Sequence, residues 1–378
     1  MQQKVIINRL TNMKVLAFVT RKSGQLSLEE VTLSAPKATE ALVKIIACGV
    51  CHTDAAALHS FIPVTLPIIL GHEGVGIVEE VGSEVTTLKK GDRVIMSFPS
   101  CGRCDYCRDS HPYACDNLNT LFFDGTYNDG TKRFSQHGMA ISSFFGQGSF
   151  AEYTIVDARN AVKVAIESDD KLANLCSLGC GVQTGAGAVL NRLKPKKGSS
   201  IAVFGCGGVG MSAIMAAAIT ECSAIIGIDI VPERLELARQ LGATHVINSN
   251  EEDPVEGIKR ITGGGAHSSI EASGVAKVIL QSLACLRRNG IAVLLSVTGP
   301  EEVGIPLEAS LMNPSVTLMG LCEGGANPQT FIPELVRYYK EGRLPVEKLT
   351  KFYDFKDIEK AFEDAHSGLA IKPVLRFP

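Results

Sequence analysis

The sequence predicts an α/β protein that pairs a β-rich domain with a second domain built on a doubly wound parallel sheet. Its 378 residues exceed the usual size of a single hydrophobic core, which favours two domains. Short strand-like segments separated by Gly, Pro and Ser fill the first part of the chain. From about Val182 onwards, apolar strands alternate with helical stretches, and this alternation indicates parallel βαβ units.

Four segments of the first part carry the strand pattern and predict an all-β body: Lys14–Thr20, Ala41–Cys48, Gly74–Val81 and Arg93–Ser97. In the second part we expect strands at Ser200–Phe204, Ala224–Ile230, Ser268–Ala272 and Ile291–Ser296, and helices at Val209–Thr220, Pro232–Leu241 and Ala276–Leu286. From about Glu323 we expect irregular structure, interrupted by a helix near Pro333–Glu341 and a closing strand near Pro373–Phe377.

The composition is that of an ordinary packed protein, with 45% hydrophobic and 20% charged residues. The net charge is -3 and both signs are interspersed, so neither nucleic acid nor a membrane is an expected partner. Ile201–Thr220 is uncharged, but its central glycines favour a strand, a turn and a buried helix over a membrane span. The stretch Met1–Asn12 lacks the pattern of a secretory leader, so we expect a cytoplasmic protein.

Four cysteines fall within one charged segment, CGRCDYCRDSHPYAC. Cys101, Cys104, Cys107 and Cys115 are separated by two, two and seven residues, close enough to surround one tetrahedral ion. Free cysteines prefer apolar burial, whereas this segment also carries Arg, Asp and His. An iron–sulfur cluster also takes four thiolates, yet nothing else in the sequence requires a redox centre. We therefore expect zinc, and the complete ligand set predicts a structural site.

A second set of metal-ligand types is spread over three segments. Cys51 begins CHTD at the end of a predicted strand, His72 and Glu73 lie in GHEG before another, and Cys180 stands between two glycines near the domain boundary. Each segment alone is weak, because a lone His or Cys is more often a turn or core residue. Together, two cysteines and one histidine make a zinc site with an open position, where zinc acts as a Lewis acid. Glu73 would bind zinc transiently or stay outside the ligand set, and Asp54 is a plausible acceptor for the other ring N–H of His72.

A glycine-rich turn marks a nucleotide-binding site. The turn follows an apolar strand and opens a helix, which is the context that a dinucleotide-binding motif requires; its residues are Gly205, Gly207, Gly208, Val209 and Gly210. Asp229 ends the next strand, at the place of the acid that binds the adenosine ribose. A carboxylate there repels a 2'-phosphate, so NAD is favoured over NADP, although the nearby Arg234 weakens that preference.

With these three sites in this order, the chain resembles the zinc-containing medium-chain alcohol dehydrogenases from about Met13 to Phe377. The resemblance rests on GHEGVGIVEEVG at Gly71, CGRCDYCRDSHPYAC at Cys101 and LGCGVQTGAG at Leu178. GVCHTD, FFGQGSFAEY and LGCGVQTGAGAVL look most like the aryl-alcohol (benzyl alcohol) and geraniol dehydrogenase branch. The resemblance implies a GroES-like catalytic domain in two segments, 1–181 and 323–378, which flank a Rossmann NAD-binding domain at 182–322.

The resemblance also implies two zinc ions per chain, a catalytic ion on Cys51, His72 and Cys180 and a structural ion on the four loop cysteines. Thr53 matches the family hydroxyl that bonds the substrate oxygen. Implied cofactor contacts are His52, which matches the residue at the pyrophosphate, and Thr184 and Lys372. Ala56 is a departure, since liver-type enzymes carry there a histidine that ends the proton relay. We therefore expect the proton to pass from Thr53 to the nicotinamide ribose hydroxyl, and then to solvent rather than to His52.

These residues predict reversible NAD-linked oxidation of a primary alcohol to an aldehyde by a homodimer or homotetramer. By family alignment the residues near the substrate are Phe61, Ile62, Phe98, Phe144 and Phe145. Aromatic walls suit a flat benzylic or allylic alcohol. The alternative is that these residues belong to the hydrophobic core. One alternative is glutathione-dependent formaldehyde dehydrogenase, against which the apolar pocket speaks, since that enzyme must anchor an anionic tripeptide. The other is a non-catalytic zinc- and nucleotide-binding protein of the same fold.

Overall fold

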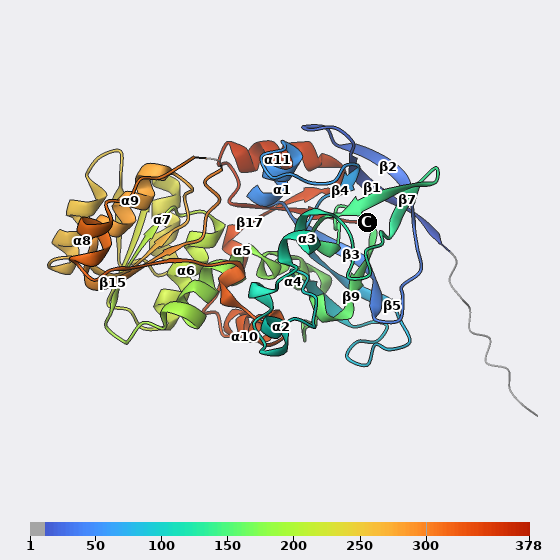
Figure 1. Ribbon diagram of the computed structural model, residues 1–378, viewed down its shortest axis with the longest axis horizontal. Helices are drawn as coiled ribbons and strands as arrows, with labels where there is room; N and C mark the ends of the chain where they lie inside the picture. The colour runs from blue at the N-terminus through green and yellow to red at the C-terminus, as the bar shows by residue number, and fades with distance from the viewer. Residues whose placement is uncertain (1–11, 300) are drawn as a thin grey trace, which may run out of the picture.

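The computed structural model describes residues 12–299 and 301–378, and it shows two halves joined along one side (Figure 1). Nearly all of Met1–Asn12, on which the expectation of a missing leader rests, lies outside the described residues. In the β-rich half, a small closed barrel contains β1 (Met13–Thr20), β2 (Ser27–Leu33), β7 (Phe134–Gln136), β8 (Met139–Ser143) and β4 (Ile68–Ile69).

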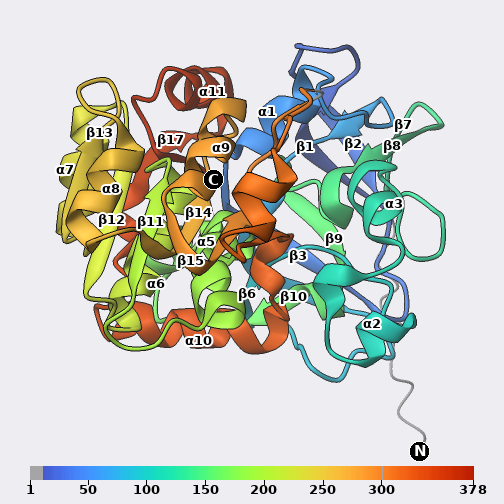
Figure 2. The ribbon, with the colours of Figure 1, turned by 60° about the vertical axis from the view of Figure 1, so that its left-hand side comes forward.

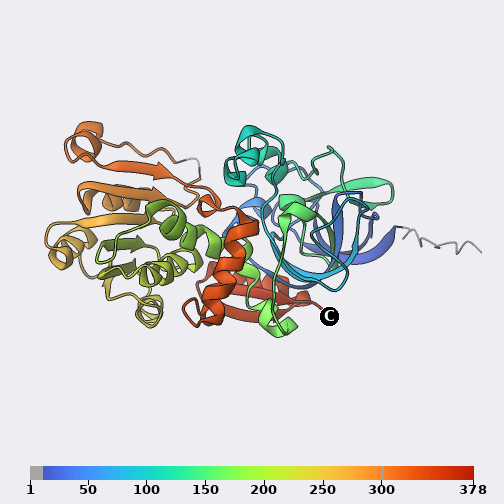
Figure 3. The same ribbon diagram turned by 90° about the horizontal axis from the view of Figure 1, so that it is seen from below.

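A second sheet of seven strands shares this half. Its order is β10 (Ala161–Lys163), β6 (Arg93–Met96), β5 (Glu73–Val81), β3 (Glu40–Gly49), β18 (Lys372–Arg376) and β17 (Thr350–Asp354), and β9 (Tyr153–Asp157) also pairs with β3. The last strand of the chain, β18, runs antiparallel to β3. The C-terminal segment therefore returns to the sheet of the first part, as its red strands show in Figure 3.

The other half is a six-stranded parallel sheet. Its order is β13 (His245–Asn248), β12 (Ala224–Asp229), β11 (Ser200–Phe204), β14 (Ala266–Glu271), β15 (Leu286–Leu294) and β16 (Thr317–Gly320). The helices of this half are α6 (Gly208–Ile219), α7 (Pro232–Gln240), α8 (Pro254–Thr262) and α9 (Ala276–Ala284). Strand order reverses at β11, and this is the doubly wound arrangement that binds dinucleotides at the carboxyl ends of its strands.

The uncharged stretch Ile201–Thr220 is β11, a turn and α6, as predicted. All five residues of β11 are buried, and α6 is buried from Gly210 to Ala217. An apolar sequence is therefore what a central parallel strand and its covering helix require. Within the described part of the chain, no helix is long and apolar enough to cross a membrane.

The predicted strands of both parts are present within a few residues, but two expectations are wrong. The first part is not all-β, because it also contains α1 (His52–Leu58), α2 (Asp105–Arg108), α3 (Leu118–Phe123) and α4 (Asp169–Ala173). The segment after Glu323 is not irregular: it forms α10 (Pro328–Lys340), β17 and α11 (Ile358–His366). The Asn327 side chain accepts a hydrogen bond from the Gln329 N–H and begins α10 earlier than the predicted start at Pro333.

The two halves meet along α5 (Gly181–Gly187), which packs closely on α6 (Figure 2). A Cβ atom on Gly185 would lie 1.9 Å from the carbonyl oxygen of Val209, so only glycine permits this approach. The proposed domain boundaries, 181/182 and 322/323, fall at the start of α5 and shortly after β16. They stay predictions, which the return of β18 to the first sheet supports.

Candidate catalytic metal and nucleotide site

Three segments far apart in the sequence meet between the two halves. Cys51 precedes α1, His72 and Glu73 lie at the start of β5, and Cys180 precedes α5. One ligand atom from each of the four residues lies within 4.8 Å of the others. The sequence placed Cys51 at the end of a strand, but β3 ends at Gly49 and Cys51 is the N-cap of α1. The structure thus brings together every residue predicted for this metal site.

His72 is held so that one ring nitrogen faces the other ligands. Its Nδ1 lies 2.9 Å from Asp54 Oδ1, as predicted, and Asp54 also accepts the backbone N–H groups of Cys51 and Gly71 at 3.1 and 3.0 Å. The other nitrogen, Nε2, is buried and has no hydrogen-bond partner among the described residues. Burial would lower the pKa of His72, but the Asp54 carboxylate outweighs it and raises the pKa well above its ordinary value. A buried, unpartnered and electron-rich Nε2 fits a metal ligand.

Glu73 is paired with a lysine from the far end of the chain. Both carboxylate oxygens accept hydrogen bonds from Lys372 Nζ at 2.9 Å, and both side chains are buried. Burial raises the pKa of Glu73 and the charge of Lys372 opposes the rise. Burial also acts to lower the pKa of Lys372, but Glu73 outweighs it and raises that pKa above its ordinary value. Lys372, predicted as a cofactor contact, is thus fixed beside the ligand set.

The glycine-rich turn lies next to the same ligands. A Cβ atom added to Gly181 would lie 3.6 Å from Glu73 Oε1 and 3.9 Å from both Lys372 Nζ and Val209 Cγ2. Val209 lies in the first turn of α6, which the glycine-rich segment opens, so the metal ligands, the lysine and this segment form one continuous site. This contiguity is what a reaction between a metal-activated substrate and a nucleotide cofactor requires.

The turn has the geometry of a pyrophosphate-binding loop. Gly205 has φ of 88°, and a Cβ atom on Gly210 would lie 1.8 Å from the carbonyl oxygen of Gly205, so both positions exclude larger residues. A Cβ on Gly207 would meet no atom within 4 Å, which leaves open space in front of the N-terminus of α6. An exposed helix N-terminus behind such space attracts the negative charge of phosphate groups.

Asp229 lies at the end of β12, as predicted. Its Oδ2 accepts the N–H of Cys206 at 2.7 Å, and its Oδ1 accepts the N–H groups of Ile230 and Val231 at 2.7 and 3.0 Å. A carboxylate has about four acceptor sites, so capacity for a ribose hydroxyl remains. Arg234 is half-buried, and its Nε has no partner among the described residues.

The remaining predicted contacts are present at the same junction. Thr53 Oγ1 lies 3.7 Å from Cys51 Sγ. His52 is exposed on the first residue of α1, and the Thr184 hydroxyl donates to the carbonyl oxygen of Cys180 at 2.8 Å. Thr53 is therefore placed beside the ligand set.

The aromatic residues named from the family alignment do not form one open wall. Phe144 has no exposed surface and Phe98 only 3%, which favours the core interpretation for both. Phe145 stacks on the ring of His72 with a centroid distance of 4.6 Å, and it also stacks on Phe122 with a centroid distance of 4.0 Å. Phe61 is 76% exposed, and Ile62 beside it is half-buried.

The cysteine loop forms a separate compact site between β6 and β7. One sulfur from each of Cys101, Cys104, Cys107 and Cys115 lies within 4.8 Å of the others. Backbone N–H groups of Arg103 and Cys104 donate to Cys101 Sγ at 3.5 and 3.3 Å. Burial opposes ionisation, but these donors lower the pKa of Cys101 to about 6. Four converging sulfurs with amide donors fit a tetrahedral metal ion.

Two buried residues of the catalytic site escaped the sequence analysis. Gln147 has no exposed surface and donates from Nε2 to the carbonyl oxygen of His72 at 2.9 Å. Glu323 is 7% exposed and accepts a hydrogen bond from Gln183 Nε2 at 3.1 Å. Gln147 lies within the quoted motif FFGQGSFAEY, which assigned it no role, and Glu323 has no sequence signal because it reaches the site only through tertiary structure.

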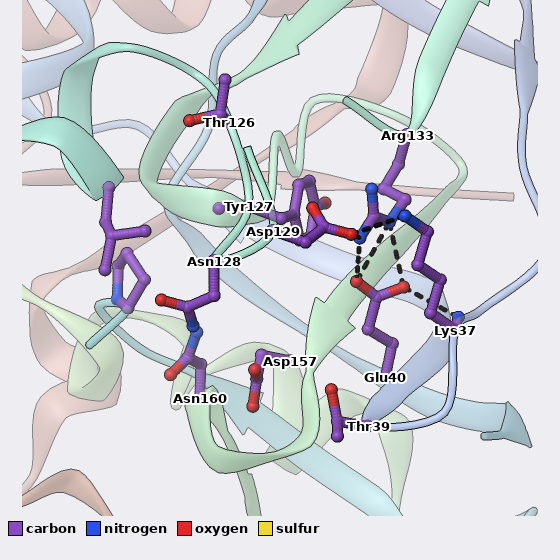
Figure 4. A pocket seen from close by; sticks show the side chains of 13 residues that line it. Lys37, Thr39, Glu40, Thr126, Tyr127, Asn128, Asp129, Arg133, Asp157 and Asn160 are labelled. Carbon is purple, nitrogen blue, oxygen red and sulfur yellow. Dashed lines mark hydrogen bonds and ion pairs between the residues drawn. The ribbon is translucent and has the colours of Figure 1, made fainter. Parts of the chain in front are cut away.

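A polar cavity of about 80 Å³ lies elsewhere in the β-rich half (Figure 4). The Arg133 guanidinium pairs there with Glu40 and Asp129, and Asp157 pairs with Arg159. Because each of these acids already has a cationic partner, the cavity reads as a structural ion-pair network and not as a metal site.

Comparison with known proteins agrees with this geometry. The model of the alcohol dehydrogenase GroES-like domain matches residues 37–166, and that of the zinc-binding dehydrogenases matches residues 208–340. The chain is 42% identical to a geraniol dehydrogenase of Castellaniella defragrans, over 96% of this chain and 97% of that one. It is 36% identical to an S-(hydroxymethyl)glutathione dehydrogenase of Synechocystis, over 97% and 100% of the two chains.

A comparison with solved structures supports the same family. The crystal structure of benzyl alcohol dehydrogenase from Acinetobacter calcoaceticus is 38% identical, with a TM-score of 0.93 over 97% of this chain and 100% of that one. Family models together span more than half of the chain, and the relatives match almost end to end. The β-rich half is thus a GroES-like domain, the parallel sheet is a Rossmann domain, and the chain belongs to the zinc-dependent medium-chain alcohol dehydrogenases.

Proposed function

We propose that the chain catalyses the reversible NAD-linked oxidation of primary aromatic or allylic alcohols to aldehydes. The observation that carries the proposal is the contiguity at Gly181, where the Cys51, His72 and Cys180 ligand set, the Glu73–Lys372 pair and the glycine turn meet. We further propose two zinc ions per chain, one at this set and one on the cysteine loop. A donor set of two sulfurs and one imidazole with room for a further ligand is typical of catalytic zinc.

Bound zinc would supply Lewis-acid chemistry, which lowers the pKa of a hydroxyl group at the ligand set. The protein's own residues prepare that chemistry. Asp54 orients His72. The pKa of Cys51 is held well below its ordinary value by the hydrogen bond from Cys180, which burial opposes, and by the charge of Lys372. Thr53 is placed to accept the alcohol proton, and it must pass on its own proton because a hydroxyl carries only one. With Ala56 in place of a histidine, water is the proposed final acceptor.

The proton route is tested by two substitutions. Thr53→Val should reduce NADH formation to background, whereas His52→Arg should preserve it, because water and not His52 takes the proton. A loss of activity in His52→Arg as large as that in Thr53→Val, with NAD still bound, would assign the acceptor role to His52 instead.

NAD is the proposed cofactor because Asp229 presents a carboxylate at the adenosine end of the site. Asp229→Gly should weaken NAD binding and admit NADP, because no carboxylate then repels the 2'-phosphate and Arg234, whose Nε has no partner among the described residues, is nearby in the sequence. Equal turnover of NADP and NAD by the unmodified protein would contradict this proposal.

The substrate class is proposed from two relatives, a geraniol dehydrogenase and a benzyl alcohol dehydrogenase, which act on an allylic and an aromatic alcohol. NADH formation at 340 nm should be compared for benzyl alcohol, geraniol, ethanol and S-(hydroxymethyl)glutathione, each with NAD and with NADP. We expect the first two alcohols to give the highest kcat/KM. The second candidate, S-(hydroxymethyl)glutathione oxidation, is favoured by the Synechocystis relative and would be preferred if the glutathione adduct were the best substrate.

We also propose a homodimer or homotetramer. Strand β16 is one of the two outer strands of the described parallel sheet, and the nearby Leu307 and Met312 are 63% and 71% exposed. An open edge beside apolar side chains is a favourable surface for a second copy. Light scattering coupled to gel filtration measures the assembly, and a monomer at micromolar concentration would contradict the proposal.

A further inference from the structure

Glu323 is a buried carboxylate beside the candidate catalytic site for which the proposed chemistry has no role. It lies in η7 (Glu323–Gly325) with φ of 47°, a left-handed conformation that non-glycine residues rarely adopt. The next residue, Gly324, is pressed onto α5: a Cβ atom there would lie 2.1 Å from the carbonyl oxygen of Gln183. The fold thus holds this acid in place at a conformational cost.

Only one oxygen of the carboxylate is occupied. Gln183 Nε2 lies 3.1 Å from Glu323 Oε2, and the same nitrogen lies 2.6 Å from the carbonyl oxygen of Gly179, the neighbour of Cys180. Glu323 Oε1 makes no hydrogen bond to any residue that the structure describes. The acid is therefore anchored to the segment that carries a metal ligand, with one acceptor atom free.

The charges around the site leave Glu323 without a partner. A bound zinc ion would be offset by the thiolates of Cys51 and Cys180, and Lys372 already offsets Glu73. The Glu323 carboxylate then remains as uncompensated negative charge in a buried place. The hydrogen bond that it accepts comes from the neutral amide of Gln183, and no lysine or arginine pairs with it among the described residues.

The proposed function supplies that cation. Hydride transfer requires the nicotinamide ring to lie about 3 to 3.5 Å from the alcohol carbon, and the alcohol must reach the ligand set. Glu323 also follows β16 at the carboxyl edge of the parallel sheet, the edge along which a dinucleotide binds. The ring is positively charged in the oxidised cofactor and neutral in the reduced one.

Resting on the proposed function, we propose that Glu323 is a cofactor-selecting residue whose carboxylate stabilises the cationic nicotinamide ring of NAD+ and gives no such stabilisation to NADH. Because hydride transfer to the ring removes its positive charge, this interaction favours entry of NAD+ and release of NADH. The residue therefore raises the share of the enzyme that carries NAD+, the cofactor form with which alcohol oxidation begins.

The test is calorimetric titration of the zinc-loaded protein with NAD+ and with NADH at pH 8. Glu323→Gln should weaken NAD+ binding about tenfold and NADH binding less than about twofold. Glu347→Gln, which removes an exposed charge distant in the sequence from the site, should change neither. Equal weakening of both cofactors by Glu323→Gln, or no change, would overturn the proposal.

A second pair of Glu323 variants provides the test if Glu323→Gln does not fold. Glu323→Asp and Glu323→Asn have the same size, differ in charge, and both suit a left-handed residue better than Gln does. We expect the ratio of the NAD+ to the NADH dissociation constant to be about tenfold higher in the Asn variant. Equal ratios would overturn the inference, whereas an unmodified protein that binds neither cofactor would refute the proposed function itself.

Discussion

At the scale of single residues, the catalytic site is organised by buried acids, each with a distinct partner. Asp54 accepts three hydrogen bonds and fixes His72, Glu73 is neutralised by Lys372, and Glu323 keeps one oxygen free. Sequence reasoning found the first two, because both lie beside predicted metal ligands in the motifs CHTD and GHEG. It missed Glu323, since the residue reaches the site through the packing of η7 on α5 and nothing local marks it.

Asp54→Asn should lower zinc affinity at the catalytic site by about 10- to 100-fold. The amide N–H group of Asn would face one of the three hydrogen-bond donors that the Asp54 carboxylate now binds, and the two donors would repel each other. Competition with a chromophoric chelator measures this affinity. Asp124→Asn, an exposed acid of the same domain, is the control and should leave it unchanged. Wild-type affinity in a correctly folded Asp54→Asn protein would show that Asp54 does not position the ligand.

Lys372→Met should lower the free energy of unfolding by about 3 to 5 kcal/mol, because it leaves the buried charge of Glu73 without a partner. Adding Glu73→Gln should recover much of that loss, since the uncompensated charge is then gone. Urea unfolding of the two single variants and the double variant gives the coupling. Additive losses would mean that the two side chains do not interact in solution.

At the scale of elements, the spacing of Cys101, Cys104, Cys107 and Cys115 predicted their convergence, because one short loop brings all four together. No comparable spacing or motif predicted α11 or β17. These two elements depend on Asp364, which is 2% exposed and pairs with Lys351 of β17 and Lys360 of α11. The prediction of an all-β body was also wrong after β3, because Cys51 is the N-cap of a helix whose first turn places Asp54 against His72.

Asp364→Asn should destabilise the protein most at pH 7, and the loss should become smaller as the pH falls below about 4. The ion pair with Lys351, then that with Lys360 and the Tyr353 hydroxyl, holds the pKa of Asp364 well below its ordinary value. Stability from a depressed pKa is fully present above the unfolded value of about 4 and is lost as the pH falls from there through the lower pKa of the folded protein. The difference in Tm between the two proteins, measured from pH 3 to pH 7, should therefore be smaller at pH 3 than at pH 7 without vanishing. A constant difference in Tm would contradict this role.

Cys107→Ser should lower Tm before it affects the chemistry, because metal binding can contribute on the order of 10 kcal/mol to a small structural site. The loop helix η1 (Pro112–Ala114) lies against η7, so its loss should also loosen the segment that carries Glu323. Full thermal stability with two zinc ions per chain would show that the loop is not a structural zinc site.

At the scale of the whole molecule, the return of β18 to β3 is the feature on which the site depends. That pairing carries Lys372 to Glu73 across nearly the whole sequence, while α5 brings Cys180 against the glycine turn of the Rossmann domain. Alternating strands and helices predicted the parallel sheet, and the glycine pattern predicted its nucleotide edge. The closed barrel and the return of the C-terminal segment depend on long-range strand pairing, which no local pattern specifies; only the family resemblance implied that return.

The most direct test of the account is the zinc content of Cys180→Ser, determined by elemental analysis together with its rate of benzyl alcohol oxidation. We predict two zinc ions in the unmodified protein and one in the variant, with NADH formation at background and cooperative thermal unfolding retained. Substantial alcohol oxidation by Cys180→Ser, or two zinc ions still bound to it, would contradict the claim that this ligand set holds the catalytic metal.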